Sequence, residues 1–220
     1  MIGDITATMK FGEVTSASGA SFLASKMSGI MGLAYDTISV DGFKTFMDVN
    51  TLKDKSFSFY LHSNPTQSYM VMPGMDTENY SVVQSHKVVE EKYWALNLVS
   101  ITNAGKKIDA SKYKGVIDSG TSLIVGPKEI INEMIAGITV DSTCKGLDKL
   151  PEIGFTLDDQ YYPLTAEDYV LKVTELGQTE CLLGIQSMDM PAGFNYIIMG
   201  DVFMRKYPSY FNLNDNTVSF

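Results

Sequence analysis

The chain has 220 residues, of which 45% are hydrophobic, and this content is enough to bury a sizeable core in one large or two small globular domains. Its formal net charge is -9 and its acidic residues are scattered, which leaves no basic face for nucleic acid or anionic lipid. No run of about 18 apolar residues indicates a membrane span, and residues 1–6 lack the charged and apolar regions of a secretory signal, so no signal peptide is expected in this chain.

The first part of the chain contains short apolar patterns. Residues 4–12 alternate apolar and polar side chains, which predicts a strand with one solvated face. In residues 27–35, Gly29 and Gly32 are expected to allow close backbone approach around their apolar neighbours. Residues 43–49 carry apolar side chains at helical spacing and predict a short helix.

The following segments predict β-structure. Residues 56–61 and 93–101 have apolar side chains at alternate positions, which is typical of strands. The sequence Asn103-Ala-Gly105 after the second segment predicts a hairpin turn. His62 and His86 lie far apart in strand or turn contexts, and we interpret both as surface residues rather than metal ligands.

A single carboxylate in residues 115–127 is the most distinctive feature of the sequence. An apolar segment leads into Asp118, and Gly120 permits a sharp backbone turn beside it. Ser119 and Thr121 surround the carboxylate with hydroxyl donors, and apolar residues then resume the β-pattern. The pattern predicts an acid held on a rigid loop, although the same residues would also suit an inert turn.

The remaining segments complete the predicted elements. Pro127 followed by apolar residues at helical intervals predicts an amphipathic helix that packs on the core. Residues 196–205 predict a strand, a glycine and a helix that Asp201 caps and Pro208 ends.

Two features bear on the cellular compartment. Cys144 and Cys181 are the only cysteines, and taken alone they suit either two buried thiols in the cytosol or one disulfide in a secreted protein. Asn79-Tyr-Ser81 has the N-glycosylation pattern, which is consistent with the secretory route.

Several of these segments, in this order, resemble motifs of the pepsin-like aspartic proteases, the pepsin and cathepsin D family. The apolar-apolar-Asp-Ser-Gly-Thr-Ser pattern resembles the second active-site loop of the family. Ser28 and Pro73 depart from the usual Asp and Gly of two other motifs. The matching segments are 28–35, 56–61, 69–76, 93–105, 116–127, 150–156, 162–164, 196–205 and 210–220.

The resemblance implies a mostly-β, bilobal acid protease fold with short helices that here lacks most of the first lobe. Residues 1–85 would be the end of the N-terminal lobe and the interlobe strands, and residues 86–220 the C-terminal catalytic lobe. It also implies a disulfide between Cys144 and Cys181 and a location in the lysosome, in an acidic vacuole or outside the cell.

The same resemblance implies the activity and the site residues. The family hydrolyses proteins and peptides at acidic pH with two aspartates and an activated water, and it uses no cofactor or metal. Asp118 would be the second catalytic aspartate, with Ser119, Gly120 and Thr121 supporting its loop. Gly120 and Thr121 would also contact substrate, as would Val116 and Ile198. Gly32 and Gly200 would pack the two active-site loops.

The first aspartate of the pair is not found in the sequence. Asp76-Thr-Glu78 lacks the glycine of the family's Asp-Thr-Gly, and no flap motif is recognised. We therefore expect this chain alone to be inactive without an N-terminal lobe. Two other hypotheses stay open: a non-catalytic homologue that binds peptide or protein, and a homodimer that rebuilds the pair.

Overall fold

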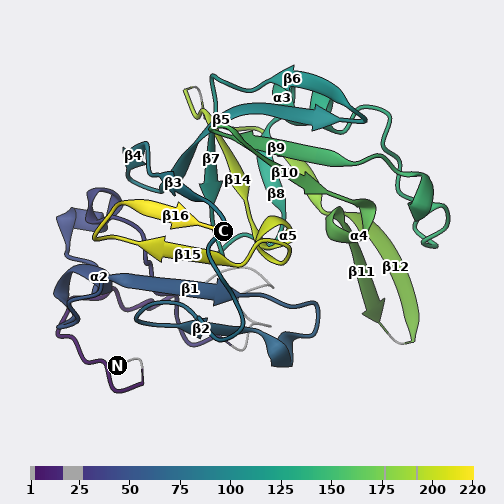
Figure 1. Cartoon of the computed structure of the whole chain (residues 1–220). Helices are drawn as coiled ribbons and strands as arrows, with labels where there is room; N and C mark the ends of the chain where they lie inside the picture. The colour runs from purple at the N-terminus through teal and green to yellow at the C-terminus, as the bar shows by residue number, and fades with distance from the viewer. Residues whose placement is uncertain (1–2, 17–26, 176, 192) are drawn as a thin grey trace.

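The computed structural model describes residues 3–16, 27–175, 177–191 and 193–220, and it has a mostly-β fold with short helices, as predicted (Figure 1). The strands are β1 (Ser56–Tyr60), β2 (Tyr69–Val71), β3 (Ser85–Lys87), β4 (Glu90–Glu91), β5 (Trp94–Asn103), β6 (Lys106–Asp109), β7 (Lys114–Ile117), β8 (Ile124–Pro127), β9 (Ile153–Leu157), β10 (Gln160–Leu164), β11 (Val170–Glu175), β12 (Gln178–Leu183), β13 (Ile185–Met188), β14 (Tyr196–Met199), β15 (Ser209–Asn212) and β16 (Thr217–Ser219). The helices are α2 (Phe46–Val49), α3 (Lys128–Met134), α4 (Ala166–Tyr169) and α5 (Asp201–Met204), with short 3-10 turns η1 (Asp36–Ile38), η2 (Val40–Gly42), η3 (Pro65–Gln67) and η4 (Leu147–Lys149).

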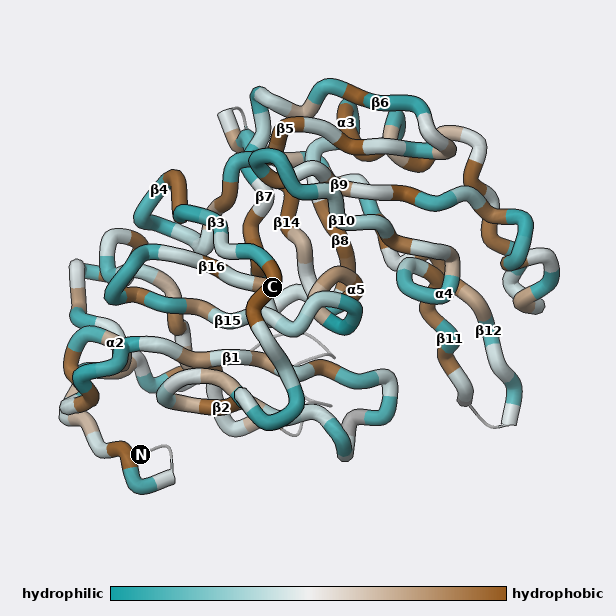
Figure 2. The backbone as a smooth tube through the Cα atoms, viewed as in Figure 1, coloured by the Kyte–Doolittle hydropathy of each residue, from teal (hydrophilic) through white to brown (hydrophobic). Residues whose placement is uncertain are grey.

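The larger sheet has the strand order β10-β9-β5-β7-β14-β8-β13, with β4 and β6 also paired to β5. Two of its pairs are parallel, β7 with β14 and β8 with β13. The central strands carry the most apolar sequence, and Figure 2 shows hydrophobic residues concentrated along β5, β7, β14 and β8. Leu96 and Leu98 on β5 are fully buried, so this strand lies in the core.

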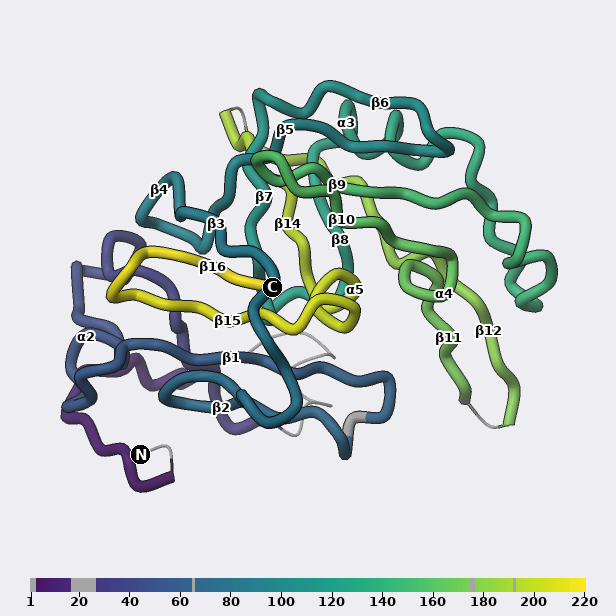
Figure 3. The backbone as a smooth tube through the Cα atoms, viewed as in Figure 1, coloured from purple at the N-terminus to yellow at the C-terminus, as the bar shows by residue number. Residues whose placement is uncertain are grey.

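A smaller sheet joins segments from opposite ends of the sequence. Its order is β2-β1-β15-β16-β3, so the last hairpin of the chain lies between β1 and β3 (Figure 3). Phe57 on β1 is opposite Phe211 on β15, and their rings stack with centroids 4.9 Å apart. The fold of residues 56–87 therefore depends on residues 209–219.

An aromatic cluster joins the two sheets. The Trp94 ring on β5 packs against Phe57 and Phe211, with centroids 5.8 and 5.2 Å away, and against Tyr35 at 5.0 Å. Its indole N–H donates to the carbonyl of Leu33 at 3.1 Å. The irregular segment before η1 is thereby attached to the larger sheet.

Several predicted elements are confirmed. Strands form where residues 56–61 and 93–101 predict them, and α3 follows Pro127 with its apolar residues buried. Ala104 and Gly105 form the two-residue turn between β5 and β6, with φ of 50° and 79°. The predicted disulfide is present, because Cys144 and Cys181 are bonded at 2.08 Å and join the loop after α3 to β12.

Two early predictions are wrong. Ile5 forms only an isolated bridge and residues 6–14 have no regular structure, because a strand needs a neighbour along its length, and alternation alone does not provide one. Side chains added at Gly29 or Gly32 would meet no atom within 4 Å, so neither glycine makes the expected close approach among the described residues.

The surface assignment of His86 is also wrong, whereas His62 is exposed as predicted. His86 is 1% exposed. Its Nδ1 lies 2.7 Å from Asp158 Oδ2 and its Nε2 lies 2.6 Å from the Tyr162 hydroxyl. The turn between β9 and β10 covers β3 at this point, and the local sequence of β3 carries no sign of that contact.

In the described ranges, no helix has both the length and the apolar character needed to cross a membrane. No group of three or more His, Cys, Asp or Glu side chains in those ranges could hold a metal ion.

Candidate active site

Strand β7 places Asp118 at the centre of the larger sheet. β7 lies between β5 and β14, and Val116 and Ile117 are buried. The Asp118 N–H donates to the carbonyl of Met199, the last residue of β14, at 3.3 Å. The neighbouring parallel strands thus end together, and the loops that follow them lie side by side.

The Asp118 carboxylate is held by its own loop. Oδ1 accepts the N–H of Gly120 at 2.9 Å, and Oδ2 accepts the hydroxyl of Thr121 at 2.6 Å. The Thr121 N–H donates back to the Asp118 carbonyl at 3.3 Å. Both carboxylate oxygens therefore have donors that fix the orientation of the group while the side chain stays half-buried.

The other hydroxyls of the loop are placed differently. Ser119 and Ser122 are exposed. In the described part of the chain, no hydrogen bond forms between the Ser119 hydroxyl and Asp118, although the Ser119 side chain lines the adjacent cavity.

The loop after β14 fits closely against the Asp118 loop because residue 200 is glycine. A Cβ at Gly200 would lie 2.0 Å from the carbonyl oxygen of Thr121 and 2.4 Å from that of Leu123. Gly200 has an ordinary φ of -83°, so glycine is needed here because there is no space for a side chain, and not because the backbone conformation is unusual. The N–H groups of Asp201 and Val202 then donate to the carbonyls of Thr121 and Ser122 at 2.8 and 3.3 Å.

The prediction that Asp201 caps α5 is wrong. Gly200 occupies the cap position and Asp201 is the first helical residue, because the backbone must pass against Thr121 at this point. The Asp201 Oδ1 atom is buried and has no hydrogen-bond partner within the described residues. Burial raises the pKa of the Asp201 carboxyl, Arg205 opposes this, and the charge of Asp118 adds to it.

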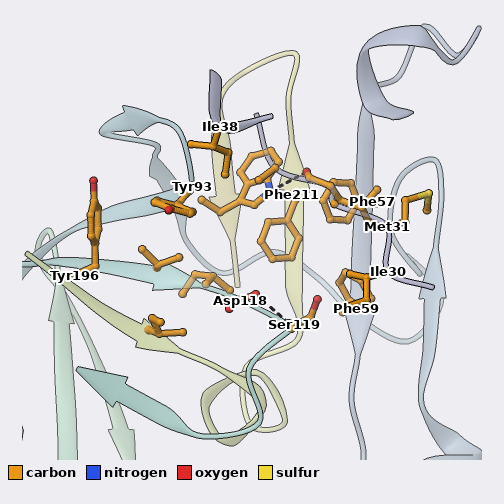
Figure 4. A pocket seen from close by; sticks show the side chains of 18 of the residues that line it. Ile30, Met31, Ile38, Phe57, Phe59, Tyr93, Asp118, Ser119, Tyr196 and Phe211 are labelled. Atoms are coloured by element: carbon orange, nitrogen blue, oxygen red, sulfur yellow. Dashed lines mark hydrogen bonds between the residues drawn. The ribbon is translucent and has the colours of Figure 1, made fainter. Parts of the chain in front are cut away.

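A mainly apolar cavity of about 510 Å³ opens beside Asp118. Figure 4 shows Asp118 and Ser119 with Tyr93 and Tyr196 toward one side and Phe57, Phe59 and Phe211 toward the other. The lining residues include four of the predicted site residues besides Asp118, namely Val116, Ser119, Gly120 and Ile198. Thr121 is not part of the lining, since its hydroxyl is turned to the carboxylate.

The sequence alone does not predict the aromatic walls of this cavity. Phe57 lies in a predicted strand and Phe211 in a family-like segment, and the signal that marks both as cavity walls is their pairing across β1 and β15, which depends on the tertiary fold. Ile30 and Met31 extend over the same cavity from the segment before η1, and Ile30 is 84% exposed (Figure 4).

Charged groups hold Tyr196, which lines one side of the cavity. The Glu90 carboxylate accepts hydrogen bonds from Lys114 and, at 2.8 Å, from the Tyr196 hydroxyl. The Lys114 and Lys92 ammonium groups and the Tyr196 hydroxyl hold the pKa of Glu90 at about 2. Burial and the neighbouring Glu90 raise the pKa of Tyr196 to about 12, so the phenol stays protonated and the contact is kept.

The chemistry available here is that of one oriented carboxylate beside an apolar cavity. The described lining contains no histidine or cysteine, so it offers no Ser-His or Cys-His pair for nucleophilic catalysis. A carboxylate can act as a base toward water or as a proton donor when a second acid shares its proton.

An acid on an Asp-Ser-Gly turn, packed against a second loop at Gly200 in a mostly-β fold, is the arrangement expected of an aspartic protease. The family model for eukaryotic aspartyl proteases matches residues 1–220, and the chain belongs to this family. It is 34% identical to cathepsin D of Chionodraco hamatus over 238 residues, which cover 100% of this chain and 60% of that protein.

Other relatives give the same result. Human cathepsin D is 33% identical over 96% of this chain and 55% of its own length, and pepsin II-1 of Oryctolagus cuniculus is 33% identical over 99% and 59%. The chain therefore spans between 55% and 60% of the length of these curated relatives.

Proposed function

We propose that the chain is part of an aspartic endopeptidase that hydrolyses peptide bonds at acidic pH, with Asp118 as one of two catalytic carboxylates. The observation that carries the proposal is the Asp118 carboxylate, held by Gly120 and Thr121 beside an apolar cavity. The second carboxylate would come from an Asp-Thr-Gly loop in an N-terminal lobe, because the chain corresponds to only part of its relatives' length.

The mechanism follows from the chemistry of two facing acids. Two carboxylates at hydrogen-bonding distance share one proton, because like charges this close cannot both persist. The ionised member takes a proton from the bridging water, which attacks the peptide carbonyl while the protonated member polarises the carbonyl oxygen. A carboxyl group then protonates the leaving amine as the carbon–nitrogen bond breaks.

The substrates are proteins and peptides bound in an extended form. Gly120 is exposed on the cavity lining and would lie along the substrate backbone, where a larger side chain would obstruct it. Val116 and Ile198 would contact apolar substrate side chains next to the cleaved bond. Thr121 contributes by holding Asp118, and a direct contact between Thr121 and substrate rests on the family resemblance alone.

The proposal extends to organisation and location. Residues 1–85 would be the end of the N-terminal lobe with the interlobe strands, and residues 86–220 the catalytic lobe. The shared sheet of β1, β2, β3, β15 and β16 suits an interlobe layer. The disulfide supports a secretory route to a lysosome, an acidic vacuole or the exterior.

The test compares Asp118→Asn with Asp141→Asn in the complete protein, including any lobe that supplies Asp-Thr-Gly. Asp141 is a matched control, because it too accepts one backbone N–H and one threonine hydroxyl, here both from Thr143, but it is not part of the described cavity lining. Asp118→Asn should abolish hydrolysis of a denatured protein at acid pH, and Asp141→Asn should leave it unchanged. Equal activity of both variants would contradict the assignment.

The same assay separates the other hypotheses. The 220-residue chain alone should not cleave. Cleavage by that chain that rises with the square of its concentration would support a homodimer instead. Peptide binding by the complete protein without cleavage at any pH would support a non-catalytic homologue.

A further inference from the structure

The turn after β2 contains an asparagine that the catalytic site does not use. Asn79-Tyr80-Ser81 has the N-glycosylation pattern, and its middle residue is not proline. Asn79 and Ser81 are exposed and Tyr80 is half-buried. No other position of the sequence has Asn-x-Ser/Thr with a residue other than proline in the middle. We propose that Asn79 is an N-glycosylation site.

The folded turn is compatible with a sugar on the amide. The Asp76 carboxylate organises the turn, since Oδ1 accepts the N–H groups of Glu78 and Asn79 at 3.1 and 3.2 Å. Oδ2 accepts the Tyr69 hydroxyl at 2.6 Å and the Asn79 side-chain amide at 2.8 Å. The amide has two hydrogens, so one can hold Asp76 while the other is replaced.

The chemistry of the modification uses this second hydrogen. The donor is an oligosaccharide linked through pyrophosphate to a membrane lipid. A bond forms between Asn79 Nδ2 and the anomeric carbon of the first sugar, and the bond from that carbon to the pyrophosphate oxygen breaks. The lipid pyrophosphate leaves with the electron pair and takes up the proton that Nδ2 loses. The remaining N–H keeps the hydrogen bond to Asp76.

The surroundings of the turn suit a solubilising group. A second, mainly apolar cavity of about 220 Å³ lies next to it, lined in part by Tyr80, Val82 and Val83. Val83 is 82% exposed. A polar glycan attached at Asn79 would shield this apolar surface from other proteins.

The cellular route implied by the disulfide also agrees with N-glycosylation. The Cys144–Cys181 disulfide indicates passage through an oxidising compartment, and N-glycans are added on the same route. This inference depends on the route of the chain and not on catalysis, so it can fail while the proposed protease activity stands.

The experiment expresses the complete protein through the secretory pathway of a eukaryotic cell. A peptide N-glycosidase should remove a glycan from this site and convert Asn79 to Asp, which mass spectrometry of the peptide detects. Asn79→Gln and Ser81→Ala should each lower the mass of the untreated protein by one glycan. Ser81→Thr should preserve the glycan, because threonine completes the same acceptor pattern.

The chain contains a matched control at Asn64-Pro65-Thr66, where proline blocks an otherwise equivalent sequence. Asn64 is also exposed. Asn64→Gln should leave the glycan mass unchanged, and Pro65→Ala should add one further glycan, at Asn64. A secreted, disulfide-bonded wild-type chain with unmodified Asn79 would overturn the proposal, as would Pro65→Ala protein modified at Asn64 but not at Asn79.

Discussion

The loop that holds Asp118 depends on the absence of a side chain at residue 200. Because a Cβ there would meet the Thr121 carbonyl oxygen at 2.0 Å, Gly200→Ala must push apart the two loops that hold Asp118. Overpacking of this kind costs about 1–3 kcal/mol or more, because backbone atoms cannot move aside as a flexible side chain can. We expect a loss of this size in the free energy of unfolding, measured by urea denaturation.

Gly12→Ala is the control for this substitution. Gly12 also has an ordinary φ, and an added Cβ would meet no atom within 4 Å. The free energy of unfolding of the Gly12→Ala variant should stay within about 0.5 kcal/mol of the wild-type value. Equal unfolding midpoints for the two variants would show that the loops adjust at no cost.

Buried His86 depends on the hydroxyl of Tyr162. Tyr162→Phe removes the hydroxyl 2.6 Å from its Nε2, and the nitrogen is then left without a partner in the interior. An unsatisfied buried polar group costs about 1–3 kcal/mol. Thermal or urea unfolding should reveal a loss of that order.

The neighbouring tyrosine provides the comparison for Tyr162→Phe. Tyr161 is 37% exposed and its hydroxyl pairs with the exposed Glu152. Water can replace that contact, so Tyr161→Phe should cost less than about 0.5 kcal/mol. If both substitutions have the same small effect, the His86 contact contributes nothing to stability.

Local sequence determined many of the elements. Strand β5 has apolar side chains at alternate positions, and Ala104-Gly105 supplies two positive φ angles for the turn to β6. Helix α3 shows its apolar stripe directly. Residues 4–12 show equal alternation but form no strand, because pairing depends on a neighbour that the segment's own pattern does not specify.

Glu90 connects three strands, and its lowered pKa makes the stability of the fold depend on pH. It lies on β4 and holds Lys114 of β7 and Tyr196 of β14. Because its pKa falls from 4.5 to about 2 on folding, its ionised form stabilises the folded state. This stabilisation is complete above the unfolded value and is lost as pH falls through the folded one, so it persists in part at pH 3–4.

Glu90→Gln tests this pH dependence. The variant should be less stable than the wild type by up to about 1 kcal/mol at pH 6, since the ion pairs are partly exposed, and the difference should vanish toward pH 2. Urea midpoints across this range measure it. Glu133→Gln, which removes the exposed 3.4 Å pair with Lys106, should show almost no difference at any pH. A Glu90→Gln deficit that does not change with pH would contradict the account.

The sequence indicates the acid but not the cavity beside it. Asp118, Gly120 and Thr121 lie within four residues of one another, so their local geometry could be expected from the motif. Phe57 and Phe211 come together only because the last hairpin inserts beside β1. The apolar walls therefore could not be predicted without the pairing of distant strands.

These walls lead to the last prediction. Ile30 and Met31, which are 84% and 43% exposed, lie on the lining of the larger cavity. Exposed apolar surface of this kind promotes association. A protein consisting of these 220 residues should self-associate through this surface, and Ile30→Ser should raise the dissociation constant by at least about tenfold, because burying one isoleucine contributes about 1.5–3 kcal/mol. Sedimentation velocity over a concentration series measures the change.

Val83→Ser is the matched control, since Val83 is 82% exposed but lines the smaller cavity. In the chain glycosylated at Asn79, where the glycan shields Val83, this substitution should leave the dissociation constant unchanged. If Val83→Ser weakens association as strongly as Ile30→Ser, the contact is a general effect of apolar surface. If neither substitution changes the dissociation constant, the cavity beside Asp118 is not the associating surface. A homodimer in which two Asp118 loops face each other across this cavity then has no structural basis.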